Sequence, residues 1–181
     1  MDELRDRIYW WSLDLIHEGQ TLPGIVLLLA TWNFAYFRYH MRDFPLAEFE
    51  RLLKDCHFEQ FDGRNFETID LSDHTTAESI KRIFESLAGL EAIRSVGATK
   101  IMHLMAPKVF VMWDTSIRKH YGAKHTGNGY LDFMATLQKM YKNGQFGPLD
   151  NNVTIPRAID LYNIRAYPRA ANKPRPKRAS A

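Results

Sequence analysis

The sequence predicts an all-α fold, an orthogonal bundle of about eight or nine short helices that form two lobes around a groove. Three observations predict it. Apolar residues recur at the spacing of one face of a helix in most segments. Glycine and proline stand between these segments, where helices end or begin. Segments with the alternating pattern of a half-buried strand are few.

The N-terminal part of the chain contains three amphipathic segments. Their apolar stripes predict helices over 8–16, 23–39 and 46–53. Gly19 and Pro45 fall in the gaps between them, where a helix stops most readily.

The middle of the chain begins with a long polar connection. Residues 57–73 lack a helical stripe, and we expect a short strand near 68–71. Thr75 and Glu78 have the spacing of a capping box, so they predict the start of the next helix, which Gly89 ends.

A helix-hairpin-helix element is predicted near 85–105. Its turn is expected at Ser95-Val96-Gly97, followed by a helix over 98–105. Asp114 then stands where an N-cap belongs, ahead of a helix over 115–121, because a carboxylate there accepts the unpaired backbone N–H groups.

Two further helices, over 133–141 and 156–165, complete a single domain at 1–165. Residues 166–181 carry five Lys or Arg and no acid, and predict a basic disordered tail. The chain has a net charge of +3, so the body without this tail carries −2. The tail would attract phosphate backbones, or serve solubility alone.

Composition excludes several classes of protein. A chain of 181 residues that is 45% hydrophobic can bury a core without disulfide bonds or bound metal. Its one cysteine, Cys56, forms no internal disulfide. No Cys and His spacing matches a zinc site, so we expect neither metal nor cofactor. The longest apolar run, near 25–30, is too short to span a membrane, and we expect no secretory signal because the first residues lack a basic start followed by an apolar core. We expect a cytoplasmic, nucleoid-associated protein, or a nuclear one in a eukaryote.

Residues 94–118 are the most informative segment. They contain Val96-Gly97, then Lys100, then Asp114-Thr115-Ser116-Ile117 followed by Arg118. This order resembles the helix-hairpin-helix (HhH-GPD) superfamily of base-excision DNA glycosylases, whose signature is a hairpin ending in Val-Gly, a lysine near the next helix start in bifunctional members, and an Asp-Thr motif. Here the lysine stands three residues after the glycine, where the family usually has two, and the arginine comes one position early.

The resemblance implies excision of a damaged base from double-stranded DNA by a monomeric enzyme. Lys100 would be the nucleophile of a Schiff-base lyase step, because an amine near a helix start loses its proton more readily. Asp114 would stabilise the positive charge that develops on the sugar. The phosphate backbone would meet the hairpin and the following basic residues: Val96, Gly97, Thr99, Arg118 and Lys119.

The pocket for a flipped base needs aromatic walls and polar groups. Trp32 and Trp113 are the candidate walls, and Asn33 and His103 the candidate hydrogen-bonding groups. Each of these aromatics also suits the protein core, and His103 suits a buried structural position.

Three functions therefore stay open. The leading one is a DNA glycosylase, with an oxidised purine such as 8-oxoguanine as the first choice of lesion. The alternative is a non-catalytic helix-hairpin-helix DNA-binding protein. The third is an unrelated helical protein in which Asp114 is only a cap and Lys100 only a surface charge.

Overall fold

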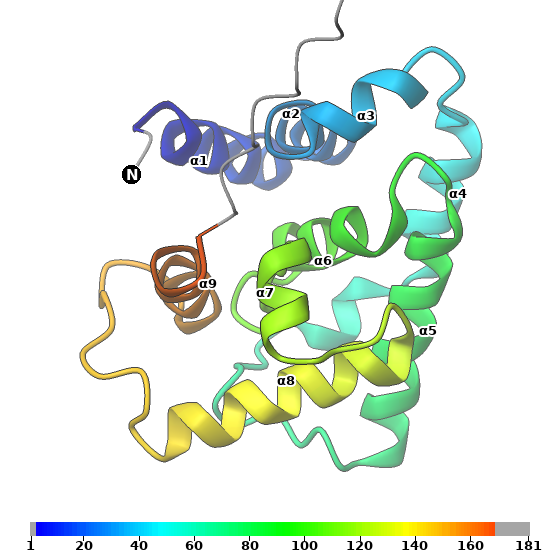
Figure 1. Ribbon diagram of the computed structural model, residues 1–181. Coiled ribbons are helices and arrows are strands. Elements are labelled where there is room, and N and C mark those ends of the chain that lie inside the picture. Colours follow the sequence, from blue (N-terminus) through cyan, green and yellow to red (C-terminus); the bar gives the residue numbers. More distant parts are fainter. Residues whose placement is uncertain (1–2, 169–181) are drawn as a thin grey trace, which may run out of the picture.

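The computed structural model describes residues 3–168, and all regular structure within that range is helical, as predicted (Figure 1). Nine α-helices and one 3-10 helix follow in order: α1 (Glu3–His17), α2 (Thr21–Trp32), α3 (Phe34–His40), α4 (Leu46–Asp55), η1 (Phe58–Phe61), α5 (His74–Gly89), α6 (Arg94–Met105), α7 (Thr115–His120), α8 (Gly127–Lys142) and α9 (Ile155–Ala166).

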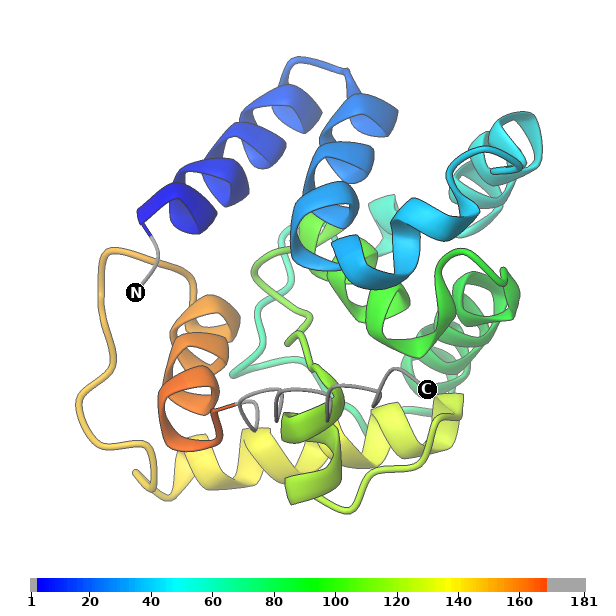
Figure 2. The ribbon, with the colours of Figure 1, turned by 45° about the horizontal axis from the view of Figure 1, so that its top comes forward.

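The helices lie in two layers with α6 between them. Helices α1, α2 and α3 form the upper layer of Figure 1, and α8 runs along the lower edge. Helix α6 packs against α5 on one side and against α1 and α2 on the other. The last helix, α9, closes the side of the molecule between α1 and α8 (Figure 2). Residues at the start of α1, the end of α2 and the middle of α6 therefore lie close to α9.

The expected helix over 23–39 is two helices, and the break falls at Asn33. The N–H of Asn33 bonds to the carbonyl of Leu29 and ends α2, while its own carbonyl accepts the N–H of Phe37 and starts α3. Its ψ of 21° departs from helical geometry. Its side chain makes no cap hydrogen bond to α3, so backbone contacts alone define the break.

The expected strand near 68–71 is absent, and turns occupy that part of the described chain. Two carbonyls, one just before that segment and one within it, are bonded by a side chain instead. The Gln138 amide, on α8, donates to the carbonyl of Phe66 at 2.7 Å and to that of Ile69 at 2.9 Å. Since these buried acceptors are satisfied, the segment needs no strand partner.

One predicted helix start is confirmed, and two others differ in the structure. Asp114 caps α7 as predicted, and its side chain accepts the N–H of Ile117. The cap of α5 is Asp73, which accepts from Thr76, so the capping box expected at Thr75 and Glu78 is wrong. Helix α8 begins at Gly127, earlier than expected, with Thr126 as its cap.

The hairpin between α5 and α6 lies earlier than predicted. Residues 90–93 form the turn, and the residues expected there, 95–97, lie in the first turn of α6. The N–H groups of Ile93 and Arg94 both bond to the carbonyl of Leu90, and Ile93 is fully buried. Arg94 takes the left-handed conformation, with φ of 51°, that reverses the chain direction. Core packing of an apolar turn thus replaces the glycine turn that the sequence suggested.

Candidate functional site

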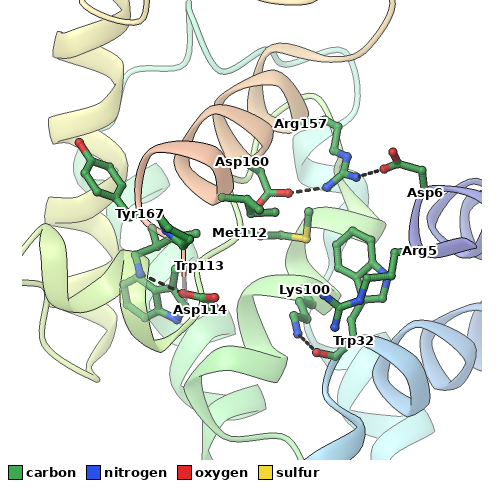
Figure 3. Close-up of a pocket in the computed structure, with 13 residues that line it drawn as sticks. Arg5, Asp6, Trp32, Lys100, Met112, Trp113, Asp114, Arg157, Asp160 and Tyr167 are labelled. Carbon is green, nitrogen blue, oxygen red and sulfur yellow. Dashed lines mark hydrogen bonds and ion pairs between the residues drawn. The ribbon is translucent and has the colours of Figure 1, made fainter. Parts of the chain in front are cut away.

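A cavity of about 290 Å³ lies where α1, α2, α6, α7 and α9 meet. Figure 3 shows Lys100 and Asp114 on one side of it, and Arg157 and Asp160 on the other. Its charged lining is balanced, with three cations and three carboxylates: Arg5, Lys100, Arg157, Asp6, Asp114 and Asp160. The apolar lining includes both predicted wall residues, Trp32 and Trp113. The sequence-predicted pair Lys100 and Asp114 therefore shares one pocket with its predicted walls.

Lys100 extends from α6 towards the end of α2. Its Nζ donates a 2.8 Å hydrogen bond to the carbonyl oxygen of Trp32, the last residue of α2 (Figure 3). The residue is only 4% exposed. Lys100 also interacts electrostatically with the carboxylate of Asp160 on the opposite wall. It is a buried residue with partners, and not the solvated surface charge that was one alternative.

Asp114 is held in place from both directions along the chain. Its Oδ1 accepts the N–H of Ile117 at 2.9 Å. The buried residues before it run extended, and their backbone groups bond to side chains: the Tyr130 hydroxyl donates to Val111, and the N–H of Trp113 donates to Thr99. The half-buried carboxylate thus reaches the pocket from a fixed backbone.

Trp113 and Trp32 contribute to the pocket in different ways. Trp113 is 1% exposed, and its indole N–H donates to the carbonyl of Ser95. Trp32 is less buried and stacks on Tyr9 with 6.0 Å between ring centroids. Trp113 is therefore a rigid wall, and Trp32 offers more ring surface to a ligand.

The opposite wall is a charge cluster that the sequence interpretation missed. Arg157, at the start of α9, is 2% exposed and pairs with Asp160 and, at 2.6 Å, with Asp6 on α1. The guanidinium also lies 4.5 Å from the ring centroid of Tyr9 and 5.0 Å from that of Trp32. Because an arginine stays charged in proteins, this group is a permanent cation.

Asp160 is as deeply buried as Arg157. Burial raises the pKa of its carboxyl to about 6, against the opposing attraction of Arg157 and Lys100. A buried ion pair costs desolvation energy, so it is weak evidence for stability and a better sign of a specific role. The sequence signal was an Arg and an Asp three residues apart within the otherwise apolar run that starts α9.

His103 does not reach the pocket. It is fully buried, with Nδ1 2.7 Å from the carbonyl of Phe110 and Nε2 2.8 Å from the Tyr9 hydroxyl. A carbonyl only accepts, so Nδ1 carries the proton and Nε2 accepts from Tyr9. Burial accordingly lowers the pKa of His103 to about 4. It joins α6 to α1 as a neutral ring, and the structure does not bring it to a ligand.

The predicted phosphate-binding residues are not gathered on one surface. Thr99 and Gly97 are buried in α6, and the N–H of Gly97 is already bonded to the carbonyl of Ile93. Arg118 folds back onto the carbonyl of Ala123.

The three remaining predicted site residues lie in different parts of the structure. Val96 packs half-buried against the core, and Lys119 is exposed on α7. Asn33 lies at the break between α2 and α3 and is outside the pocket lining. Of the predicted phosphate contacts, Lys119 alone has an exposed side chain within the described range.

The predicted tail begins inside the site. Helix α9 ends at Ala166, and the next two residues, Tyr167 and Pro168, line the pocket. Tyr167 stacks on His120 of α7 with 3.5 Å between ring centroids. The remaining tail, 169–181, lies outside the described residues.

Residues 3–168 contain no cluster of His, Cys, Asp or Glu arranged to hold a metal ion. No helix in that range has the length and apolar character needed to cross a membrane. No protein-family model, curated protein or solved structure matches the chain.

Proposed function

We propose that the protein is a DNA glycosylase that removes a damaged base from double-stranded DNA. The observation that carries the proposal is the shared pocket of Lys100 and Asp114, walled by Trp32 and Trp113. Trp32 lies 68 positions before Lys100 in the sequence, and it lines the same pocket as Lys100, Trp113 and Asp114. An unrelated helical protein gives no reason for them to meet.

The chemistry of base excision suits this lining. Breaking the bond between the sugar C1′ and the base leaves positive charge on the sugar and negative charge on the base. The carboxylate of Asp114 would stabilise the sugar cation and accept a proton from the attacking group. Its cap bond to Ile117 fixes its position before substrate arrives, so little reorganisation is needed.

The size of the cavity also suits a single flipped base. A volume of about 290 Å³ lies just below the range for drug-sized ligands, about 300–1,000 Å³. Flipping enzymes hold the base between aromatic or apolar side chains, and Trp32 offers its ring to the pocket. An oxidised purine such as 8-oxoguanine is the lesion we propose first.

The decisive experiment is a panel of duplex oligonucleotides with one lesion each, assayed separately for base release and strand cleavage. We expect wild-type protein to release one class of base and Asp114→Asn to release it at least about 100-fold more slowly. Asparagine is also a good N-cap, so α7 stays formed.

A matched control is Asp73→Asn, which changes the equivalent cap of α5, away from the pocket. Its base release should equal that of wild type. Salt-dependent DNA binding without release of any base would instead favour the non-catalytic DNA-binding protein. Equal release by wild type and Asp114→Asn would refute the role of Asp114.

A further inference from the structure

The place of Lys100 within α6 bears on how the glycosidic bond is broken. The sequence interpretation put this lysine near a helix start, where the positive field favours a neutral amine. Helix α6 begins at Arg94, so Lys100 lies more than a turn and a half further along. The field of a helix terminus falls off within one turn, and that reason for losing the proton no longer applies.

The amino group of Lys100 instead lies at the negative end of a different helix. Its acceptor, the carbonyl of Trp32, belongs to the last turn of α2, where carbonyls lack partners within the helix. Cations are stabilised at this end of a helix by the aligned peptide dipoles. A buried hydrogen bond of 2.8 Å to such a carbonyl favours the ammonium form of the lysine.

The charges around the pocket act in the same direction. Arg157 opposes a second cation, but it is directly paired with two carboxylates, Asp160 and Asp6. Those three groups together carry one negative charge when both acids are ionised. Asp160 interacts with Lys100 as well as with Arg157, and Asp114 adds a further carboxylate to the lining. These four groups then carry two negative charges, which the ammonium of Lys100 and the guanidinium of Arg5 balance.

We propose that Lys100 is a fixed ammonium that ties the end of α2 to the pocket and donates to the departing base, and that water, not the lysine amine, attacks the sugar. This inference rests on the proposed glycosylase function. The bond between C1′ and the base nitrogen breaks, and its electron pair leaves with the base. The oxygen of water bonds to C1′, and the proton of that water passes through Asp114 to the released base.

The opposite charges of Asp114 and Lys100 then match the opposite charges that develop as the bond breaks. The carboxylate of Asp114 faces the sugar cation, and the ammonium of Lys100 faces the base anion. The products are a free base and an abasic site in an intact strand. A Schiff base with the enzyme and elimination of the 3′ phosphate do not occur.

The test uses the full chain and the oligonucleotide on which it releases a base. We expect borohydride to trap no covalent complex and the strand to stay uncut until alkali is added. Lys100→Met should lower base release about 100-fold, and Lys100→Arg should retain about tenfold more activity than Lys100→Met, since arginine restores a cation but not a nucleophilic amine. Lys139→Met, a change of an exposed lysine on α8, is the matched control.

A second measurement is independent of activity and of any variant. In nitrogen-15 spectra of the wild-type lysine side chains at pH 7, the Nζ of Lys100 should couple to three protons, as an ammonium does. A neutral amine, a trapped adduct on Lys100 or another amine, or equal activity of the Arg and Met variants would overturn this inference. Release of no base from any lesion would overturn the glycosylase proposal, while the Nζ signal alone would still decide the charge of Lys100.

Discussion

The two walls of the pocket are built in different ways. The α6 wall, with Lys100 on α6 and Asp114 at the start of α7, has local features, a helix and an N-cap bond to Ile117, and is joined to α2 by the hydrogen bond from Lys100 to Trp32. The α9 wall, with Arg157 and Asp160, is joined to the rest of the molecule by an ion pair to Asp6 and by the rings of Tyr9 and Trp32. The α6 wall was therefore visible in a sequence pattern, and the α9 wall was not.

The largest expected difference between the walls concerns Arg157. Its replacement in Arg157→Met leaves Asp160 buried without its direct cation, and we expect the free energy of unfolding to fall by about 3–5 kcal/mol. Urea unfolding at pH 7 measures it. Arg165→Met, an exposed change on the same helix, should stay within about 0.5 kcal/mol of wild type. Equal stability of the two variants would mean that the α9 wall does not depend on this charge cluster.

Two buried groups, His103 on α6 behind the pocket and Asp160 on α9, should also respond to pH in opposite directions. The pKa of His103 on α6 is lowered to about 4 in the folded state. Below pH 6.5, the usual pKa of histidine, the unfolded chain therefore binds a proton at this residue that the folded state does not bind. Its contribution to stability is complete above pH 6.5 and is lost as the pH falls towards 4, by about 3 kcal/mol. His103→Gln should remove this slope from urea unfolding curves measured between pH 4 and 7. An unchanged slope would contradict the assignment of a neutral His103.

For Asp160 on α9, the contribution to stability should fall as the pH rises. Its pKa is raised from 3.8 to about 6, so the folded state holds a proton that the unfolded chain releases. Its contribution is complete below pH 3.8 and is lost as the pH rises through 6, by about 2–3 kcal/mol. The difference in stability between wild type and Asp160→Asn should therefore shrink or reverse from pH 4 to pH 7. A difference that grows over this window would contradict the raised pKa.

The smallest effect is expected at the contact that links α1 to α6. Tyr9→Phe removes the hydroxyl that bonds to Nε2 of His103 and leaves a buried acceptor unsatisfied, at a cost of about 1–2 kcal/mol. Thermal and urea unfolding measure it. Tyr39→Phe is the control, because the side chain of Tyr39 is exposed. No loss in Tyr9→Phe would show that water replaces the hydroxyl.

The break at Asn33 and the start of α6 show where sequence patterns lose accuracy. Asn33 lies in a segment with continuous helical periodicity, and the start of α6 lies beside residues that resemble a glycine turn. In each place two backbone paths satisfy the same sequence pattern. Burial of Ile93 and the paired bonds around Asn33 selected one path. The choice changed the chemistry, because it moved the helix start away from Lys100 and put the end of α2 beside it.

The sequence alone determined the all-helical class, the cap at Asp114 and the selection of Lys100, Asp114, Trp32 and Trp113 as candidates. Helical periodicity and N-caps depend on residues within about four positions of each other, so they can be recognised along the chain. The tertiary structure alone decided the partners of those residues. The contacts between Lys100 and Trp32, Tyr9 and His103, and Arg157 and Asp6 join residues 68, 94 and 151 positions apart. No local pattern specifies such pairs, because they form only when packing of the apolar helix faces brings the helices together.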